Sequence, residues 1–263
     1  MSSVSYTIQD SSTMLRRNLR HMQRYPSLTL MLVGQPIVFL LLFVYVFGGT
    51  MGAGIAGVSS GRSEYLAYIT PGILAMTVAS VALGTAISVA MDMTEGIMAR
   101  FRTLDIARVS VLTGHVLGAM IQTAIALVVV VGVALLLGFR PTAGPLDWLS
   151  AVAALGMFAF ALTWLTVALG LASGSVETAS NTPMVLMLLP FFGSGFVPTD
   201  SMPTGIRWFA DYQPFTPVIE TVRGLLMGTP VGDHVVLAIA WSIGIALVSY
   251  VWAKRLFNRD PTP

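Results

Sequence analysis

The residues that could catalyse a reaction are few and scattered in this sequence. Its three histidines, His21, His115 and His234, lie far apart, and it contains no cysteine. Neither the His-Glu-x-x-His pattern of zinc hydrolases nor the Gly-x-Ser-x-Gly elbow of serine hydrolases occurs. The triplet Gly193-Ser194-Gly195 is more typical of a helix bend or a close packing contact. We therefore expect no catalytic, cofactor-binding or metal-binding residue in this chain, and we expect His115 to be a packed or interfacial histidine rather than a base.

Residues 91–111, MDMTEGIMARFRTLDIARVSV, alternate charged and apolar side chains. The segment opens with acidic residues and then becomes basic, at Arg100, Arg102 and Arg108. The apolar residues between these charges are Met98, Phe101, Leu104 and Ile106. One interpretation is a solvated connector between two helices. A short surface helix that docks on a partner protein explains the embedded apolar residues better.

Residues 196–228, FVPTDSMPTGIRWFADYQPFTPVIETVRGLLMG, form a second unusual segment. The segment is too apolar for a free loop and too interrupted by proline for one long helix. Its aromatic residues are of the kind that gathers at membrane–water interfaces: Trp208, Phe209, Tyr212 and Phe215. From Thr216 to Met227 the apolar residues have helical spacing. We expect two short helices here, which either cap a helix bundle or gate an exit.

Small and mildly polar residues recur at spacings of three and four along residues 66–91. They are Thr77, Ser80, Gly84 and Ser88, and Asn181 is a further mild polar residue later in the chain. Such residues let membrane helices approach each other closely. Close packing is the simpler interpretation of this stripe, and the lining of a mildly polar pathway is the alternative.

The composition indicates which elements must position these residues. The 263-residue chain is 55% hydrophobic and only 10% charged, whereas soluble domains carry about a quarter charged residues. An integral membrane protein is therefore predicted, and six apolar runs suit spanning helices of about 20 residues each. The expected spans are 27–48, 66–91, 109–137, 149–172, 182–197 and 234–253. Pro183 and Pro190 interrupt the fifth run, which is also the shortest.

The remaining residues divide into an N-terminal region, 1–26, a connecting loop, 92–108, an external segment, 198–233, and a tail, 254–263. Within the N-terminal region, Leu15, Leu19 and Met22 follow helical spacing, with arginines on the other faces. We expect an amphipathic helix over residues 11–25, ended by Pro26, in the headgroup layer. This helix either anchors the chain or senses a partner.

The positions of the basic residues predict how the chain is oriented in the membrane. Ten of the fourteen fall on one side of a six-span arrangement. These are Arg16, Arg17, Arg20, Arg24, Arg100, Arg102, Arg108, Lys254, Arg255 and Arg259. Because Lys and Arg gather in cytoplasmic loops, we expect both termini in the cytoplasm.

The expected span interiors carry no charge that an ion-driven transporter would use. Asp92 and Glu95 lie at the cytoplasmic end of the second span, and Glu177 lies in a short cytoplasmic loop. Ion-coupled carriers usually place ionisable groups at membrane depth. The chain also has no Gly-x-x-x-x-Gly-Lys-Ser/Thr loop for phosphate. If ATP drives this protein, another chain must bind it.

Two of these segments resemble the permease subunits of ABC-2 type drug exporters, in the daunorubicin-resistance branch of that family. The first is EGIMARFRTLDIARVSVLTGHVLG, residues 95–118. The second is the segment 196–228, with Met-Pro at 202–203, Gln-Pro-x-Thr-Pro at 213–217 and Arg-Gly-Leu-Leu-Met-Gly at 223–228. The resemblance covers nearly the whole chain in order. One departure is Asp105, which stands where the family usually has proline.

The resemblance implies an all-α integral membrane protein. The implied protein has six transmembrane helices, an N-terminal amphipathic interfacial helix, and an external re-entrant helical hairpin before the last span. It assigns to a cytoplasmic coupling helix the residues Glu95, Gly96, Arg100, Phe101 and Arg102. It assigns to an external gate the residues Met202, Pro203, Pro214, Thr216, Arg223, Gly224 and Gly228. The second and fifth spans would line the pathway, with Thr77, Ser80, Gly84, Ser88 and Asn181 as candidates.

The implied partners are two ABC ATPase subunits that bind ATP and Mg²⁺, a second permease half, identical or homologous, and the lipid bilayer, without nucleic acid. The chain itself would bind no cofactor. We expect it in the bacterial inner membrane, exporting a hydrophobic or amphipathic compound such as a drug, antibiotic or lipid. The alternatives are an ion-coupled transporter or channel that works without an ATPase, and a non-transporting assembly or sensor subunit.

Overall fold

The computed structural model describes residue 16 and residues 26–49, 61–96 and 108–258, and within these every regular element is a helix. Five helices are long and apolar enough to cross a membrane. They are α2 (Pro26–Leu42), which continues as the π-helical turn η1 (Phe43–Phe47), α4 (Arg62–Thr94), α6 (Arg108–Leu136), α7 (Pro145–Ala172) and α12 (His234–Asn258). Each corresponds to one of the predicted apolar runs, so the all-helical membrane fold is confirmed.

The fifth predicted span is not one continuous helix. It is made of α8 (Val176–Asn181), α9 (Met184–Leu188) and the 3-10 turn η2 (Leu189–Phe192). Pro183 precedes α9 and Pro190 lies within η2, so each break coincides with a residue that cannot donate a backbone hydrogen bond. Within the described residues the structure therefore has five long helices rather than six, and the sixth crossing stays a prediction.

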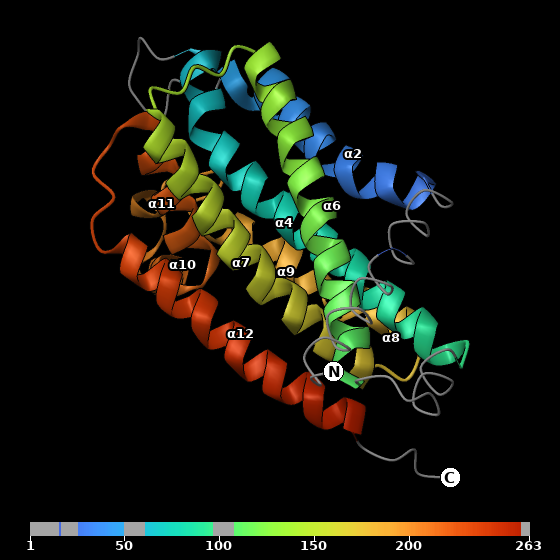
Figure 1. Ribbon diagram of the computed structural model, residues 1–263. Coiled ribbons are helices and arrows are strands. Elements are labelled where there is room, and N and C mark those ends of the chain that lie inside the picture. The colour runs from blue at the N-terminus through green and yellow to red at the C-terminus, as the bar shows by residue number, and fades with distance from the viewer. Residues whose placement is uncertain (1–15, 17–25, 50–60, 97–107, 259–263) are drawn as a thin grey trace.

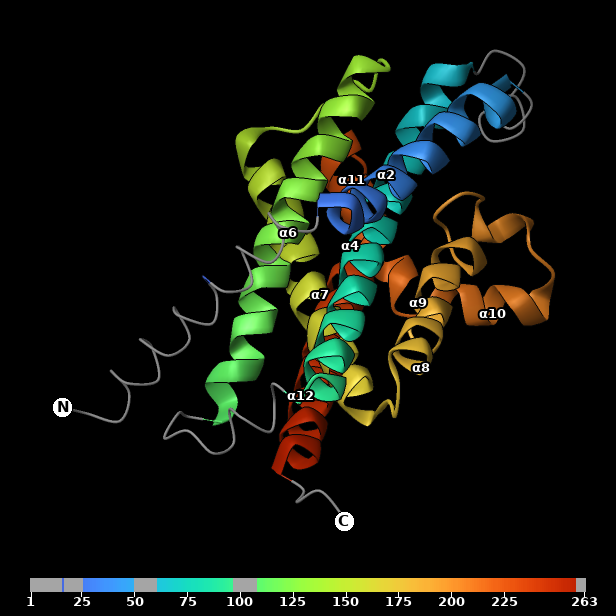
Figure 2. The same ribbon diagram turned by 90° about the vertical axis from the view of Figure 1, so that its right-hand side faces the viewer.

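The external segment folds as the short helices that its sequence predicts. These are the 3-10 turn η3 (Thr199–Ser201), α10 (Thr204–Tyr212) and α11 (Phe215–Met227). Helix α10 lies across the direction of the long helices, beside α9 (Figure 2). Helix α11 instead packs against α4, α7 and α12. The indole Nε1 of Trp241 on α12 donates to the carbonyl oxygen of Tyr212 at 3.0 Å, which attaches the end of α10 to the bundle.

Helix α6 runs in the opposite direction to α4, α7 and α12 (Figures 1 and 2). We call the lower end the one where α4, α7 and α12 end and where α6 and α8 begin. The upper end is where α4 and α7 begin and where α6 ends. At the upper end, the backbone N–H of Thr142 donates to the carbonyl of Leu226 at 3.0 Å, so the α6–α7 loop is held to the end of α11.

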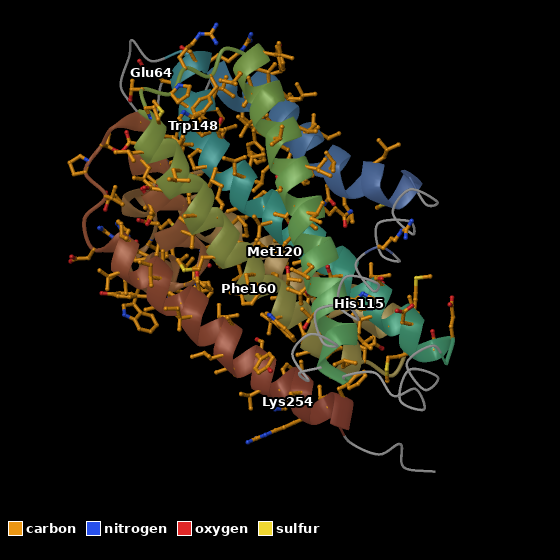
Figure 3. All side chains as sticks on the ribbon, in the orientation of Figure 1. Glu64, His115, Met120, Trp148, Phe160 and Lys254 are labelled. Carbon is orange, nitrogen blue, oxygen red and sulfur yellow. The ribbon has the colours of Figure 1, made fainter. Side chains whose placement is uncertain are left out.

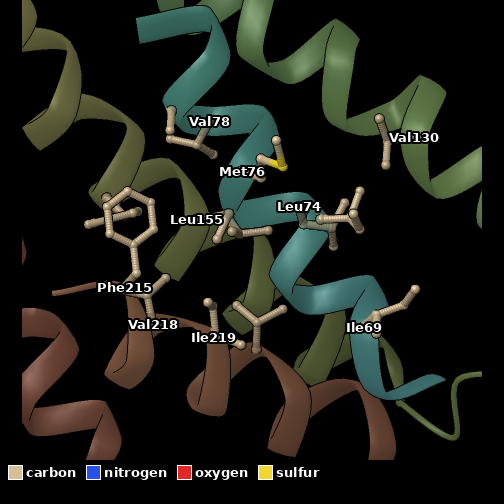
Figure 4. Packing of buried hydrophobic residues seen from close by; sticks show 14 of the residues in the cluster. Ile69, Leu74, Met76, Val78, Val130, Leu155, Phe215, Val218 and Ile219 are labelled. Carbon is tan, nitrogen blue, oxygen red and sulfur yellow. The ribbon is translucent and has the colours of Figure 1, made fainter. Parts of the chain in front are cut away.

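Helix α4 is the centre of the bundle. It contacts α2, α6, α7, α8 and α11, and most of its side chains are buried. Figure 4 shows Ile69, Leu74 and Met76 of α4 among residues of neighbouring helices, including Leu155 of α7 and Ile219 of α11. By contrast, most residues of α2, α6 and α12 are not fully buried, and many of their apolar side chains are exposed, as on helices in contact with lipid.

Candidate functional site

The guanidinium of Arg223, on α11, joins α11 to α4 and to the turn that follows η2. Its Nη2 donates to the carbonyl oxygen of Tyr68 on α4 at 3.1 Å and to that of Ser194 at 2.7 Å. Its Nη1 pairs with the carboxylate of Glu220. The guanidinium carbon also lies 3.9 Å from the centre of the Tyr68 ring, in cation–π geometry. We call these four residues the Arg223 network.

The Tyr68 hydroxyl strengthens this network, because it donates to the same Ser194 carbonyl at 3.1 Å. That oxygen thus accepts two hydrogen bonds, which uses both of its lone pairs. Arg223 keeps 11% of its side-chain surface exposed and Glu220 keeps 26%, so the pair is largely shielded from water. Charge-assisted hydrogen bonds in such surroundings hold elements together more strongly than neutral ones.

The Gly193-Ser194-Gly195 turn fits against α4 and α11 because its glycines have no side chains. A Cβ on Gly72 of α4 would collide with the backbone of Gly195, and a Cβ on Gly193 would collide with Gln213 and Thr216. The prediction that this triplet serves packing is therefore confirmed.

Gln213 is a connecting residue that the sequence analysis did not single out, although it lies in the Gln-Pro-x-Thr-Pro motif. Its Nε2 donates to the Leu189 carbonyl at 3.2 Å and to Thr216 Oγ1 at 3.1 Å, and its Oε1 accepts from the Phe215 N–H at 3.1 Å. Thr216 Oγ1 in turn accepts from the N–H of Ser194 at 3.3 Å. The side chain of Gln213 therefore joins η2 to the start of α11.

The other predicted gate residues mark the boundaries of the external helices. Met202 and Pro203 directly precede α10, and Pro214 directly precedes α11. Gly224 packs closely against residues 229–231, and Gly228 ends α11 with a φ of 68°, a conformation that glycine adopts without strain. Thr216 and Arg223 thus make the polar contacts between the external segment and the bundle, and the prolines and glycines shape its turns.

Two members of the stripe of small residues on α4, Ser80 and Gly84, contact α2. Thr77, Ser80 and Gly84 are buried, and Gly84 contacts the Leu32 side chain. Ser80 Oγ donates to the Leu32 carbonyl at 3.0 Å. Within a helix that carbonyl would accept from the residue four positions on, but this residue is Pro36, which has no N–H. Ser80 therefore supplies the hydrogen bond that Pro36 removes.

The remaining pathway candidates lie nearer the lower end. Ser88 on α4 is half-buried, and Asn181 at the end of α8 is exposed. In this single chain, the buried stripe contributes to close packing between α2 and α4, as the simpler interpretation has it. A pathway-lining role for Thr77, Ser80, Gly84, Ser88 and Asn181 stays a prediction.

The predicted coupling segment begins where α4 ends. Glu95 is exposed, and its N–H donates to the Met91 carbonyl at 2.9 Å. Gly96 follows with a φ of 69°, which stops the helix. Arg100, Phe101 and Arg102, and the unusual Asp105, lie outside the described residues. So does the predicted amphipathic helix over 11–25 except for Arg16, which is helical and exposed.

One buried polar pair lies just above this segment. The Nε2 atom of His115 on α6 is 3.1 Å from the Oδ2 atom of Asp92, in the last turn of α4. The two side chains expose 3% and 11% of their surfaces. The position of His115 is labelled in Figure 3. Sequence analysis placed both residues near the ends of apolar runs but did not pair them, because nothing in a linear sequence gives the rotation of one helix against another.

These features define a class of protein: a multi-pass helical membrane protein. Its external segment is attached to one end of the helix bundle by the Arg223 network, and a segment that connects two long helices lies at the other end. The pattern of the ABC-2 type transporter family matches residues 9–227. The chain belongs to this family and is an ABC-2 permease.

Two relatives are similar over much of their length. The daunorubicin resistance ABC transporter permease protein DrrB1 of Streptomyces coeruleorubidus is 30% identical over 247 residues, which cover 94% of this chain and 85% of that protein. The probable doxorubicin resistance ABC transporter permease protein DrrC of Mycobacterium tuberculosis is 31% identical over 193 residues, 69% of each chain. The resemblance to drug-resistance permeases is thus confirmed.

Proposed function

We propose that this chain is the membrane half of an ATP-driven exporter that carries a hydrophobic or amphipathic compound out of a bacterial cell. The lower end faces the cytoplasm, together with both termini. There the segment 92–108 seats in a separate ATPase subunit. Daunorubicin and doxorubicin, which the names of the relatives mention, are the first compounds to test as substrates.

The observation that best supports this proposal is the continuity of α4. This helix runs as one element for 33 residues, with Pro71 inside it, a length of about 50 Å at 1.5 Å per residue. Near its upper end it accepts the hydrogen bonds of Arg223, and its lower end leads directly into the proposed coupling segment. A displacement at the lower end can therefore reach the external segment through one continuous helix.

In this mechanism the ATPase supplies the chemistry and the chain supplies the movement. Glu95, Gly96, Arg100, Phe101 and Arg102 would contact the ATPase. Closure of its nucleotide-bound dimer would shift α4 and favour the conformation in which the external segment releases substrate. Two ATPases and a second permease half would complete the transporter, with ATP and Mg²⁺ bound on the ATPases alone.

The test is ATP-dependent uptake of daunorubicin into inside-out vesicles that contain the chain and the ABC ATPase subunit that copurifies with it. We expect uptake to require both ATP and the ATPase. Replacing Arg100 and Arg102 with alanine should abolish uptake, because the positive charges that seat the segment are lost. Arg207→Ala is the matched control, since Arg207 is an exposed arginine of the external segment.

Two outcomes would overturn the proposal. One is uptake by the chain alone, driven by an ion gradient without nucleotide. The other is unchanged uptake after substitution of Arg100 and Arg102 in vesicles that retain the ATPase.

A further inference from the structure

Asp92 occupies a position that is unfavourable for a lone carboxylate. It lies in the last turn of α4, where the helix dipole is negative and repels a negative charge. It is also buried, with 11% of its side chain exposed. A carboxylate in such a position needs a partner that donates a hydrogen bond. His115 provides the donor from another helix, 23 residues further along the chain.

Buried apolar residues adjoin this pair along both helices. Val89 of α4 and Leu112 and Val116 of α6 belong to one buried cluster at the lower end of the bundle. Because the side chains of Asp92 and His115 expose only 11% and 3% of their surfaces, solvent competes little with the hydrogen bond between them. The pair therefore fixes the rotation of α4 relative to α6 more firmly than the apolar contacts around it do.

The Asp92–His115 pair lies close to the two helix ends that the proposed coupling segment joins. Asp92 is two residues from the end of α4, and His115 is seven residues from the start of α6. At 1.5 Å per residue, these separations are about 3 Å and about 10 Å. Along the chain, residues 97–107 connect the end of α4 to the start of α6. A push on the segment thus reaches two helices that are pinned to each other.

We propose that Asp92 and His115 form a clasp that makes α4 and α6 move as one body when the ATPase acts on the segment between them. This inference rests on the proposed function, and it assigns both residues as positioning residues rather than substrate contacts. Without the clasp, the lower ends of α4 and α6 would move apart. Part of the displacement that the ATPase imposes would then separate the two helices instead of moving them together.

The first measurement compares substrate exported per ATP hydrolysed in vesicles that contain the whole transporter. His115→Ala should lower this ratio at least about fivefold, the lower range of typical couplings between sites. His115→Gln keeps a side-chain N–H donor, and it should retain most of the ratio. His234→Ala, at the other end of the bundle, is the matched control and should leave the ratio unchanged.

A double variant separates the clasp from a merely structural effect. In Asp92→Ala/His115→Ala the carboxylate is removed together with the imidazole that hydrogen-bonds to it, so the folding penalty that the single variant incurs at Asp92 is removed. The clasp predicts that this double variant stays as uncoupled as His115→Ala. A double variant that recovers the wild-type ratio would overturn the inference.

The second measurement does not depend on transport. The chain contains no cysteine, so spin labels can be placed at Thr94→Cys on α4 and Leu117→Cys on α6, both of which are exposed. With labelled chain diluted in unlabelled chain, the distance distribution should be narrow in the wild type and broad in His115→Ala. If His115→Ala gave the same distance distribution as the wild type, the clasp would be overturned. If the wild-type transporter showed no ATP-driven uptake, the proposed function would be overturned, whatever the distance distributions show.

Discussion

At the scale of single residues, Arg223 owes its role to the shape of its guanidinium. The group is planar, and its N–H donors reach Tyr68, Ser194 and Glu220 at once while its face covers the Tyr68 ring. An ammonium group carries the same charge but cannot make these contacts together. The identity of the residue therefore matters here as well as its charge.

We expect Arg223→Lys to destabilise the attachment of the external segment. The variant loses at least one hydrogen bond from a charged group, each worth about 1.5–3 kcal/mol. The midpoint of thermal unfolding in detergent should fall. Arg207→Lys is the matched control: the Arg207 side chain is 46% exposed and pairs with Asp200 at the surface, where such a pair is worth about 0–1 kcal/mol. Equal midpoints for the two variants would contradict the assigned role.

Sequence reasoning could find Arg223 but not its partners outside α11. The residue stands in a motif typical of the family, whereas Tyr68 lies 155 positions earlier in an apolar run. The contact is to a backbone carbonyl, which every residue has, so no side-chain pattern marks it. Ser194 stands out in the sequence only as part of a glycine triplet. Its backbone carbonyl, rather than its hydroxyl, accepts the hydrogen bonds of Arg223 and Tyr68.

At the scale of elements, the contact between α2 and α4 shows how one helix compensates for a defect in another. Pro36 leaves the Leu32 carbonyl of α2 without its usual donor, and Ser80 of α4 donates in its place. Because this hydrogen bond links two helices, it fixes their relative register as well as satisfying the carbonyl. Ser80 and Gly84 of the small-residue stripe therefore pack against α2.

A pair of substitutions tests this compensation. Ser80→Ala leaves a buried carbonyl unsatisfied and should cost about 1–3 kcal/mol. Adding Pro36→Ala restores an N–H four residues after Leu32, so the double variant should be more stable than Ser80→Ala alone. Unfolding midpoints in detergent measure both effects.

The control for this pair is Ser242→Ala. Ser242 is buried, but it donates to Ala238 of its own helix, whose hydrogen bonds remain when the hydroxyl is removed. A loss equal to that of Ser80→Ala would show that the Leu32 carbonyl has no special need of its donor.

Element boundaries were predicted well where apolar runs are long and uninterrupted. The run 109–137 matches α6, and 234–253 falls within α12, although α12 continues to Asn258. The run 182–197 was read as one span because its residues are apolar, but its two prolines divide it into short helices. An apolar composition predicts that a segment lies in the membrane or the protein interior. Whether that segment forms one continuous helix depends on its backbone N–H donors, which proline lacks.

At the scale of the whole molecule, exposed residues of the loops and helix ends lie at either the lower or the upper end of the bundle. Thr94 and Glu177 lie at the lower end, where α4 ends and α8 begins, and Thr142 lies at the upper end, in the α6–α7 loop. All three are exposed. The inferred orientation assigns the first two to the cytoplasm and the third to the outside.

Single cysteines at these positions test that orientation, since the chain has none of its own. A membrane-impermeant maleimide added to intact cells should label Thr142→Cys. It should label Thr94→Cys and Glu177→Cys only after the membrane is opened. Labelling of Glu177→Cys in intact cells, with Thr94→Cys still protected, would place the α7–α8 connection outside and contradict the inferred topology.

The unbroken course of α4 has a consequence for how signals travel in the proposed exporter. Binding free energies at the two ends of a shared element are linked, and linkage is reciprocal. A compound or antibody that holds α11 of the external segment against α4 must therefore change the affinity of the ATPase for ATP by the same factor by which ATP changes the affinity for that compound. The outer face of this permease would then be a place from which nucleotide binding inside the cell can be regulated.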